Sequence, residues 1–133
     1  MKARDILMEG MNKKDTYVIL LKFIEFAARH LDLNTLPKFD FMFDTKRSIE
    51  HKSFGGYGGE HISITVKNRH IMDVCRTLAH ELVHFKQDLD GRIEPESGKD
   101  GSPIENEANA EAAVIMRKWG KMHPELFDKL SIE

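Results

Sequence analysis

The sequence has one cysteine, no long apolar run and no apolar signal-peptide core, and each of these shortages argues against a class of protein. A single cysteine, Cys75, leaves no intramolecular disulfide bond to form. No run of about eighteen apolar residues is present to cross a bilayer. The first residues also lack the apolar core of a secretory signal peptide. We therefore expect a cytoplasmic protein that does not act in a membrane.

The sequence also lacks an excess of charge of either sign. Lys and Arg number 20 and Asp and Glu number 22, which gives a net charge of −2. Aromatic residues make up only 8% of the chain. Proteins that bind nucleic acid usually carry a basic patch or aromatic side chains on which bases stack. The composition therefore argues against a nucleic-acid partner.

The size and the balance of residue types are those of one ordinary globular domain. The chain has 133 residues, of which 41% are hydrophobic and 32% charged. Residues 1–12 have only a weak apolar pattern, so we expect this tail to fray. The prediction is a single domain over residues 1–133.

One stretch carries a chemical pattern. Residues 77–85 read TLAHELVHF and contain the motif H-E-x-x-H, whose histidines are His80 and His84. On an α-helix these two residues lie one turn apart on one face, so both imidazoles can reach one metal ion. Glu81 lies beside them and is suited to act as general base toward a metal-bound water. The competing interpretation is a charged, solvated helix face that matches the motif by chance.

The residues around this motif predict an amphipathic helix over about 71–89. At about 100° per residue, one face is apolar. It carries Ile71, Cys75, Leu78, Ala79, Leu82 and Leu89. The opposite face carries His80, Glu81 and His84. Cys75 has the chemistry of a soft metal ligand or a nucleophile, but its place opposite the histidines predicts a core residue.

A catalytic zinc site usually has three protein ligands, so a third ligand is needed. Two carboxylates compete, Glu105 and Glu107, on a helix that is predicted from the N-cap Ser102 to about residue 121. Glu105 shares its face with small and apolar residues, whereas Glu107 points roughly the other way. We favour Glu105, although it also fits a capping box with Ser102, and Glu107 stays the alternative.

Small side chains also distinguish the face that carries Glu105. Ala108 and Ala112 would let this helix approach the histidine helix closely enough for a carboxylate to reach the ion. Asn109, one turn after Glu105, could hydrogen-bond a ligand histidine.

The rest of the chain predicts an α+β protein with a long N-terminal helix and a small three-stranded sheet. The helix is expected from Asp15 or Thr16 to Leu31. Strands are expected at residues 38–44, 49–54 and 61–66. The first would bury Phe39, Phe41 and Phe43, and the last would bury Ile62, Ile64 and Val66.

Two further segments complete the predicted order of elements. The glycines within residues 55–59 are expected to form a flexible connection between strands. A phosphate-binding loop is disfavoured there because the lysine of a P-loop is missing. Residues 124–130 would add a short final helix.

The two motifs together resemble those of the gluzincin metallopeptidases, in which a helix-borne glutamate completes a zinc site. After HELVH at residues 80–84, the string ENEAN begins at Glu105. It is similar to segments of small cytosolic repressor-cleaving proteases and of membrane-bound CAAX-type peptidases. In those families the glutamate four residues before the Asn or Asp is the ligand, which maps onto Glu105 with Asn109 as its supporting residue.

The resemblance implies a minimal zincin-like fold and a zinc metalloendopeptidase that acts on a protein or peptide. Zn²⁺ would be held by His80, His84 and Glu105 and would activate a water. Glu81 would take the proton of that water and pass it to the leaving amine.

The resemblance also implies that residues 61–66 form the sheet edge along which an extended substrate pairs. Repressor-cleaving proteases usually carry an aromatic residue where this chain has Glu111, which leaves the substrate open. A hydrogen-bond donor to the transition state is expected as well. Its candidates are Tyr57, His51, His61, His70 and His123.

Two alternatives come from other functional classes. The first is a catalytically silent zinc-binding interaction module, against which Glu81 argues, because a structural zinc needs no general base. The second is a zincin-like protease that acts on DNA-associated protein, which the net charge of −2 disfavours.

Overall fold

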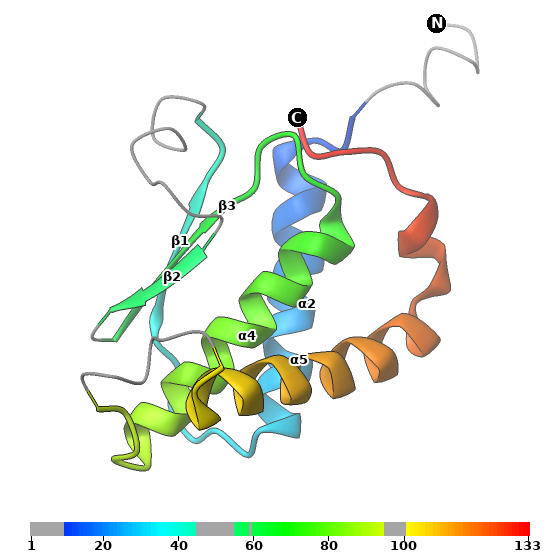
Figure 1. The fold of residues 1–133 in the computed structure, drawn as a ribbon. Coiled ribbons are helices and arrows are strands. Elements are labelled where there is room, and N and C mark those ends of the chain that lie inside the picture. Colours follow the sequence, from blue (N-terminus) through cyan, green and yellow to red (C-terminus); the bar gives the residue numbers. More distant parts are fainter. Residues whose placement is uncertain (1–9, 45–54, 59, 95–100) are drawn as a thin grey trace, which may run out of the picture.

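The computed structural model describes residues 10–44, 55–58, 60–94 and 101–133. In chain order its elements are α2 (Lys13–His30), β1 (Lys38–Met42), β2 (Gly55–Gly58), β3 (His61–Thr65), α4 (Ile71–Leu89), α5 (Pro103–Met122) and the 3₁₀ helix η1 (Pro124–Asp128). The helices and the separate sheet in Figure 1 confirm the predicted α+β class. Within the described ranges, no helix combines the length and the apolar character that a bilayer span needs.

Three strands form one mixed sheet in the order β1-β3-β2. β1 pairs in parallel with β3, and β2 pairs with β3 in the antiparallel direction. β3 therefore has a neighbour on each side. The expectation that residues 61–66 form a sheet edge is wrong, and β2 holds an edge position instead.

The glycine-rich segment is a strand and not the flexible connection that its composition predicts. β2 pairs with β3 from Gly55 opposite Ile64 to Gly58 opposite His61. Glycine has no side chain to pack on a sheet, so its presence hides a strand from sequence analysis. Its backbone pairs as well as that of any other residue. The predicted strand at residues 49–54 lies outside the described part of the chain.

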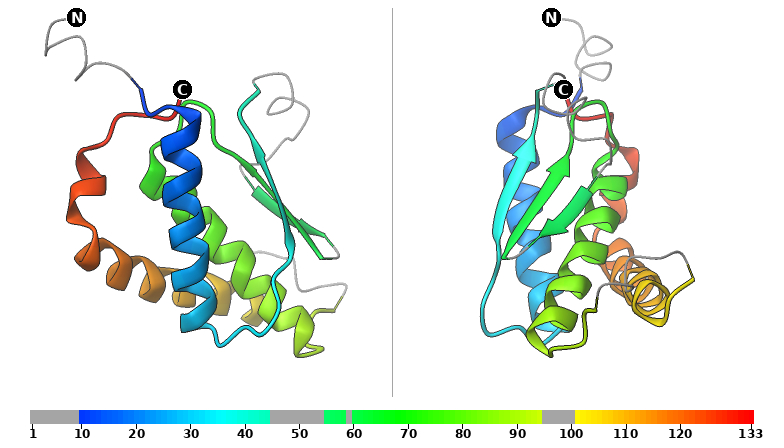
Figure 2. Two further views of the ribbon diagram at one scale, coloured as in Figure 1. Left: turned by 180° about the vertical axis from the view of Figure 1, so that it is seen from behind. Right: turned by 60° about the vertical axis from the view of Figure 1, so that its left-hand side comes forward.

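α4 is the element around which the others are arranged. It packs against α2 and α5 and against β2 and β3. Figures 1 and 2 show α2 and α4 together on one side of the sheet, with α5 running across them. A helix that is covered from several directions buries more than one stripe. Accordingly, the motif residues Glu81 and His84 are buried along with the apolar face.

The core lies between the sheet and the three long helices. Its fully buried side chains include Leu20, Phe23, Ile62, Ile64, Val66, Leu78, Leu82 and Ile115. The inward positions of β3 are thus confirmed. Two details differ from the predictions. Met42 is fully buried although it lies on the opposite face of β1 from Phe41, and Leu89, at the last turn of α4, is 50% exposed.

The helix starts follow from capping side chains. α2 begins two residues before the predicted Asp15, because the side chain of Asn12 accepts a hydrogen bond from the Asp15 backbone N–H. α4 begins after His70, whose Nδ1 accepts from the Met72 N–H. α5 begins after Ser102, as predicted, with the serine side chain accepting from the Glu105 N–H.

The two ends of the described chain meet. Met11 is buried and forms a parallel bridge with Ile132. The Met11 N–H donates to the Ser131 carbonyl at 2.9 Å, and the Glu133 N–H donates to the Met11 carbonyl at the same distance. The expected frayed tail therefore does not extend to Met11, and residues 1–9 lie outside the described part.

Candidate metal centre

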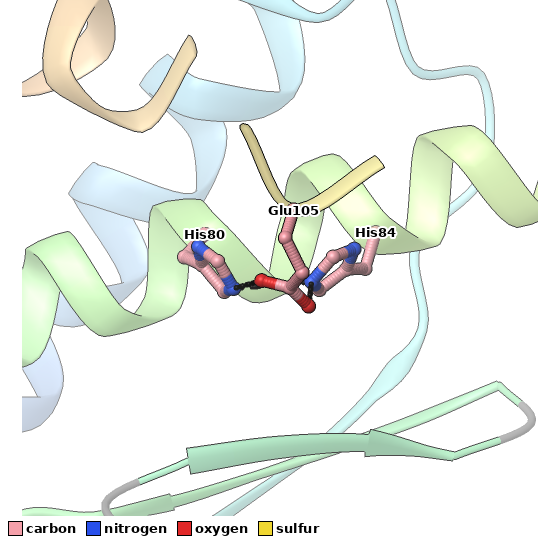
Figure 3. A group of neighbouring side chains, drawn as sticks. All are labelled: His80, His84 and Glu105. Atoms are coloured by element: carbon pink, nitrogen blue, oxygen red, sulfur yellow. Dashed lines mark hydrogen bonds and ion pairs between the residues drawn. The ribbon is translucent and has the colours of Figure 1, made fainter. Parts of the chain in front are cut away.

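Three side chains from two helices converge on one point. His80 and His84 project from neighbouring turns of α4, and Glu105 reaches them from the first turn of α5 (Figure 3). The two Nε2 atoms are 3.0 Å apart. Glu105 places Oε1 3.0 Å from Nε2 of His84 and Oε2 3.2 Å from Nε2 of His80. The structure thus brings together the three residues that the sequence favours as ligands.

These separations fit one metal ion. Zinc lies about 2.0–2.1 Å from imidazole nitrogen and carboxylate oxygen, so tetrahedral ligand atoms are about 3.3 Å apart. The two Nε2 atoms are 3.0 Å apart, and each lies 3.0 Å or 3.2 Å from a different oxygen of Glu105, which is close to that edge length. The group can therefore hold a metal ion after small side-chain shifts.

The approach of α5 to α4 depends on small residues. Ala108 and Ala112, which follow Glu105 by one and two turns, are buried in the core. A larger side chain at either position would push the helices apart. Ser102 fixes where α5 begins, so the carboxylate of Glu105 starts from a defined backbone position.

The competing carboxylate has a different partner. Arg92 donates to Glu107 through Nη1 at 2.7 Å and Nη2 at 2.8 Å. Gln87 donates to Glu107 Oε1 at 3.1 Å. These hydrogen bonds, that of Arg92 first, hold the pKa of Glu107 below its ordinary value. Glu107 is therefore placed as a neighbour of the site, and the choice of Glu105 over Glu107 agrees with the geometry.

Hydrogen bonds to protein groups surround the histidines. Asn109, which the sequence suggested as a partner of His80, lies near enough to influence the pKa of that histidine. Burial lowers the pKa of His80, the charge of His84 lowers it further, and Glu105 and Asn109 oppose this effect. Both influences that lower the pKa favour the neutral imidazole, which is the form that binds metal.

Glu81 lies within the fold beside the three converging groups. Only 8% of its surface is exposed. Burial raises the pKa of Glu81 to about 7, the negative charge of Glu105 adds to the rise, and His84 opposes it. A cation held by the neighbouring ligands would act in the opposite direction and favour the carboxylate.

Sequence reasoning missed Gln87. This residue is fully buried and lies 2.8 Å from Nδ1 of His84 through its side-chain oxygen. The signal was available, because a residue three positions after a helical histidine lies on the same face. A polar side chain at that spacing is a candidate partner for the ring nitrogen that faces away from a metal.

The candidate donors to a transition state separate into three groups. His70 caps α4 ten residues before His80, about 15 Å away along the helix axis. His123 follows α5 and lies 3.3 Å from Glu125, and His61 is an exposed residue at the start of β3. His51 and the side chain of Tyr57 lie outside the described part. Within the described residues, no hydrogen bond or ion pair joins His61, His70 or His123 to the ligand group.

Cys75 is a core residue, as predicted. Its side chain is fully buried on α4. Burial raises the pKa of the thiol far above its ordinary value. A buried, protonated thiol is a poor metal ligand and a poor nucleophile.

Comparison of the chain with protein-family models, with curated proteins and with solved structures finds no match. The resemblance to gluzincins therefore remains a prediction from the two sequence motifs. The fold adds that residues of the two motifs lie in contact with each other.

Proposed function

We propose that this protein is a zinc-dependent metallopeptidase that hydrolyses peptide bonds. The observation that carries the proposal is the convergence of His80, His84 and Glu105, which come from two motifs 21 residues apart, measured from His84 to Glu105. A carboxylate from another helix lies within 3.2 Å of both imidazoles, which supports a metal site over a solvated helix face that matches the motif by chance.

The donor set favours zinc over magnesium and calcium. Two imidazole nitrogens and one carboxylate oxygen suit zinc better than magnesium or calcium, which take mostly oxygen ligands. Three protein ligands also leave a tetrahedral ion with one open position. Zinc bound in this way makes water acidic enough to lose a proton near neutral pH and polarises a substrate carbonyl.

The remaining steps belong to Glu81. Its carboxylate accepts a proton from the attacking water as the new C–O bond forms. It then donates that proton to the amine as the peptide C–N bond breaks, so the carboxylate is regenerated. The burial of Glu81 keeps the carboxylate next to the ligand group and away from bulk water.

The sheet offers a place for the substrate. β2 is the edge strand on the side of the sheet that packs against α4, and the strands lie alongside the site in Figure 3. An extended peptide that pairs with an edge strand presents its backbone in a regular array. We assign this pairing to β2 instead of residues 61–66, because β3 already has two neighbours.

The test compares zinc-loaded wild type with zinc-loaded Glu81→Gln on a library of peptides derived from whole-proteome digests, with products read by mass spectrometry. Metal content is measured on the same samples. We expect new peptide termini from the wild type alone, with equal zinc in both proteins. Equal cleavage by Glu81→Gln, or a wild type that retains no zinc, would contradict the proposal.

A further inference from the structure

Gln87 has a polar side chain in the protein core, where polar groups are usually held by hydrogen bonds. It lies on α4 one turn after His84, and its exposed fraction is 0%. A buried amide is costly unless its hydrogen-bonding groups are satisfied. Its partners therefore show how the amide is oriented.

Two acceptors fix the amide nitrogen of Gln87. Nε2 lies 3.1 Å from the backbone carbonyl of Ile104 and 3.1 Å from Oε1 of Glu107. A carbonyl and a carboxylate accept hydrogen bonds and cannot donate them, so the NH₂ group must face α5. The side-chain oxygen is then turned toward His84.

This orientation places a hydrogen-bond acceptor against one nitrogen of His84. Oε1 of Gln87 lies 2.8 Å from Nδ1 of His84 and can only accept, so Nδ1 must be the donor. In a neutral imidazole the other nitrogen, Nε2, then has a free lone pair. Nε2 faces His80 and lies 3.0 Å from Oε1 of Glu105, which can also only accept. In the metal-free protein the two acceptors therefore compete for the His84 proton, and a cation between Nε2 and Glu105 would remove that competition.

The amide is itself anchored from the surface. Glu107 receives both the Gln87 amide and a pair of hydrogen bonds from Arg92, on the segment that follows α4. A row of contacts thus leads from Arg92 through Glu107 and Gln87 to His84. It joins α4, the segment after it and the first turns of α5.

We propose that Gln87 is a positioning residue that holds His84 in the Nδ1–H tautomer, so that Nε2 is presented to the metal, and that Glu107 and Arg92 hold Gln87 in turn. The inference rests on the proposed function, because the choice of tautomer matters only if His84 binds a metal. Under this proposal Glu107, which the sequence offers as the alternative metal ligand, supports the same site by holding Gln87.

A purely structural account of Gln87 makes a different prediction. If the amide only joined α4 to α5, its loss would destabilise the fold without changing the tautomer of His84. Zinc affinity would then fall no more than in another core variant of similar stability. The proton position on His84 is therefore the readout that separates the two accounts.

The test has two measurements on the full chain. Long-range proton–nitrogen correlation spectra assign the tautomer of His84 in the metal-free wild type at mildly alkaline pH and again with zinc. Chelator competition measures zinc affinity in wild type, in Gln87→Met, which keeps the side-chain volume, and in Ile115→Val, a core variant on α5. The same spectra are recorded for metal-free Gln87→Met. We expect Nδ1–H in the zinc-bound wild type, a smaller Nδ1–H population in metal-free Gln87→Met than in metal-free wild type, and zinc affinity weakened by about 10- to 100-fold in Gln87→Met. Ile115→Val should stay within about twofold of wild type.

Several outcomes overturn the proposal. They are zinc bound through Nδ1 of His84, the same tautomer populations in metal-free wild type and metal-free Gln87→Met, unchanged affinity in Gln87→Met, or an equal loss in Ile115→Val. The spectrum of the zinc-bound wild type decides even if Gln87→Met does not fold. A protein that cleaves peptides yet tolerates Gln87→Met contradicts this inference alone. One that binds zinc as described but cleaves nothing contradicts only the proposed function.

Discussion

Arg92 holds Glu107 through two hydrogen bonds, 2.7 Å and 2.8 Å long, one to each carboxylate oxygen. Paired in this way, Glu107 faces the segment after α4, while Glu105, two residues earlier on α5, faces the histidines. A bidentate arginine–carboxylate pair is directional as well as favourable. Two glutamates that the sequence offers as the third metal ligand therefore have different partners in the fold.

Replacement of Glu105 by alanine should lower the metal content far more than replacement of Glu107. We expect Glu105→Ala to lose stoichiometric zinc, because only two imidazoles remain. Glu107→Ala should keep about one zinc per chain with an affinity lowered by a few fold, since the Ile104 carbonyl still holds Gln87. Elemental analysis after mild chelation and return of zinc measures both. Circular dichroism shows whether each variant is folded, and zinc retained in folded Glu105→Ala would contradict the assignment.

The position of Glu105 could be predicted because it depends on local rules. A serine cap and a proline fix where α5 starts, and a period of 3.6 residues then places Glu105 among small residues and Glu107 elsewhere. The span of α4 was predictable for the same reason. Both motifs lie on helices, where spacing along the chain determines the face.

Features that depend on contacts between distant segments were not predictable in the same way. β2 consists mainly of glycine, so its pairing with β3 has no signal in side-chain alternation. The link from Arg92 to Glu107 spans 15 positions and depends on how closely α5 approaches α4. The orientation of the Gln87 amide also depends on how closely α5 approaches α4, because the amide nitrogen donates to the Ile104 carbonyl and to Glu107.

The close contact of α4 and α5 gives a second prediction. Ala108 is fully buried one turn after Glu105, whereas Ala110 is exposed on the same helix. Ala108→Leu should destabilise the fold by about 1–3 kcal/mol through overpacking and should weaken zinc binding, because the carboxylate of Glu105 is pushed away from the histidines. Ala110→Leu is the matched control and should leave both quantities nearly unchanged. Chemical denaturation and chelator competition measure them. Equal effects of the two substitutions would rule out a tight helix contact at Ala108.

The thiol of Cys75 gives a third prediction. Because the side chain is buried and its pKa is raised, a thiol reagent should modify the folded protein far more slowly than the unfolded chain. The chain has one cysteine, so the reaction reports on one site. The rate of colour release from an aromatic disulfide reagent, with and without denaturant, measures the difference. Rapid reaction in the folded state that zinc suppresses would instead indicate a thiol ligand.

The burial of Glu81 gives a prediction about pH in the metal-free protein. Its pKa rises from 4.5 in the unfolded chain to about 7 in the fold, so the folded state holds the proton more tightly between these values. The free energy of unfolding should therefore fall as pH rises from about 4.5 to about 7, by at most roughly 3 kcal/mol, and the loss persists above that range. Glu81→Gln removes this charge. The metal-free variant should match the wild type near pH 4.5 and be more stable than it above pH 7.

Urea denaturation of both proteins across this pH range, in the presence of a chelator, measures the difference. Glu60→Gln, at an exposed position, controls for the loss of one negative charge and should show no such divergence. Parallel stability curves for wild type and Glu81→Gln would mean that the carboxylate is hydrated in the fold. Divergence above neutral pH would mean that the protein maintains a buried carboxylate at a cost in stability. Such a cost is expected for a general base and has no use in a solvated helix face.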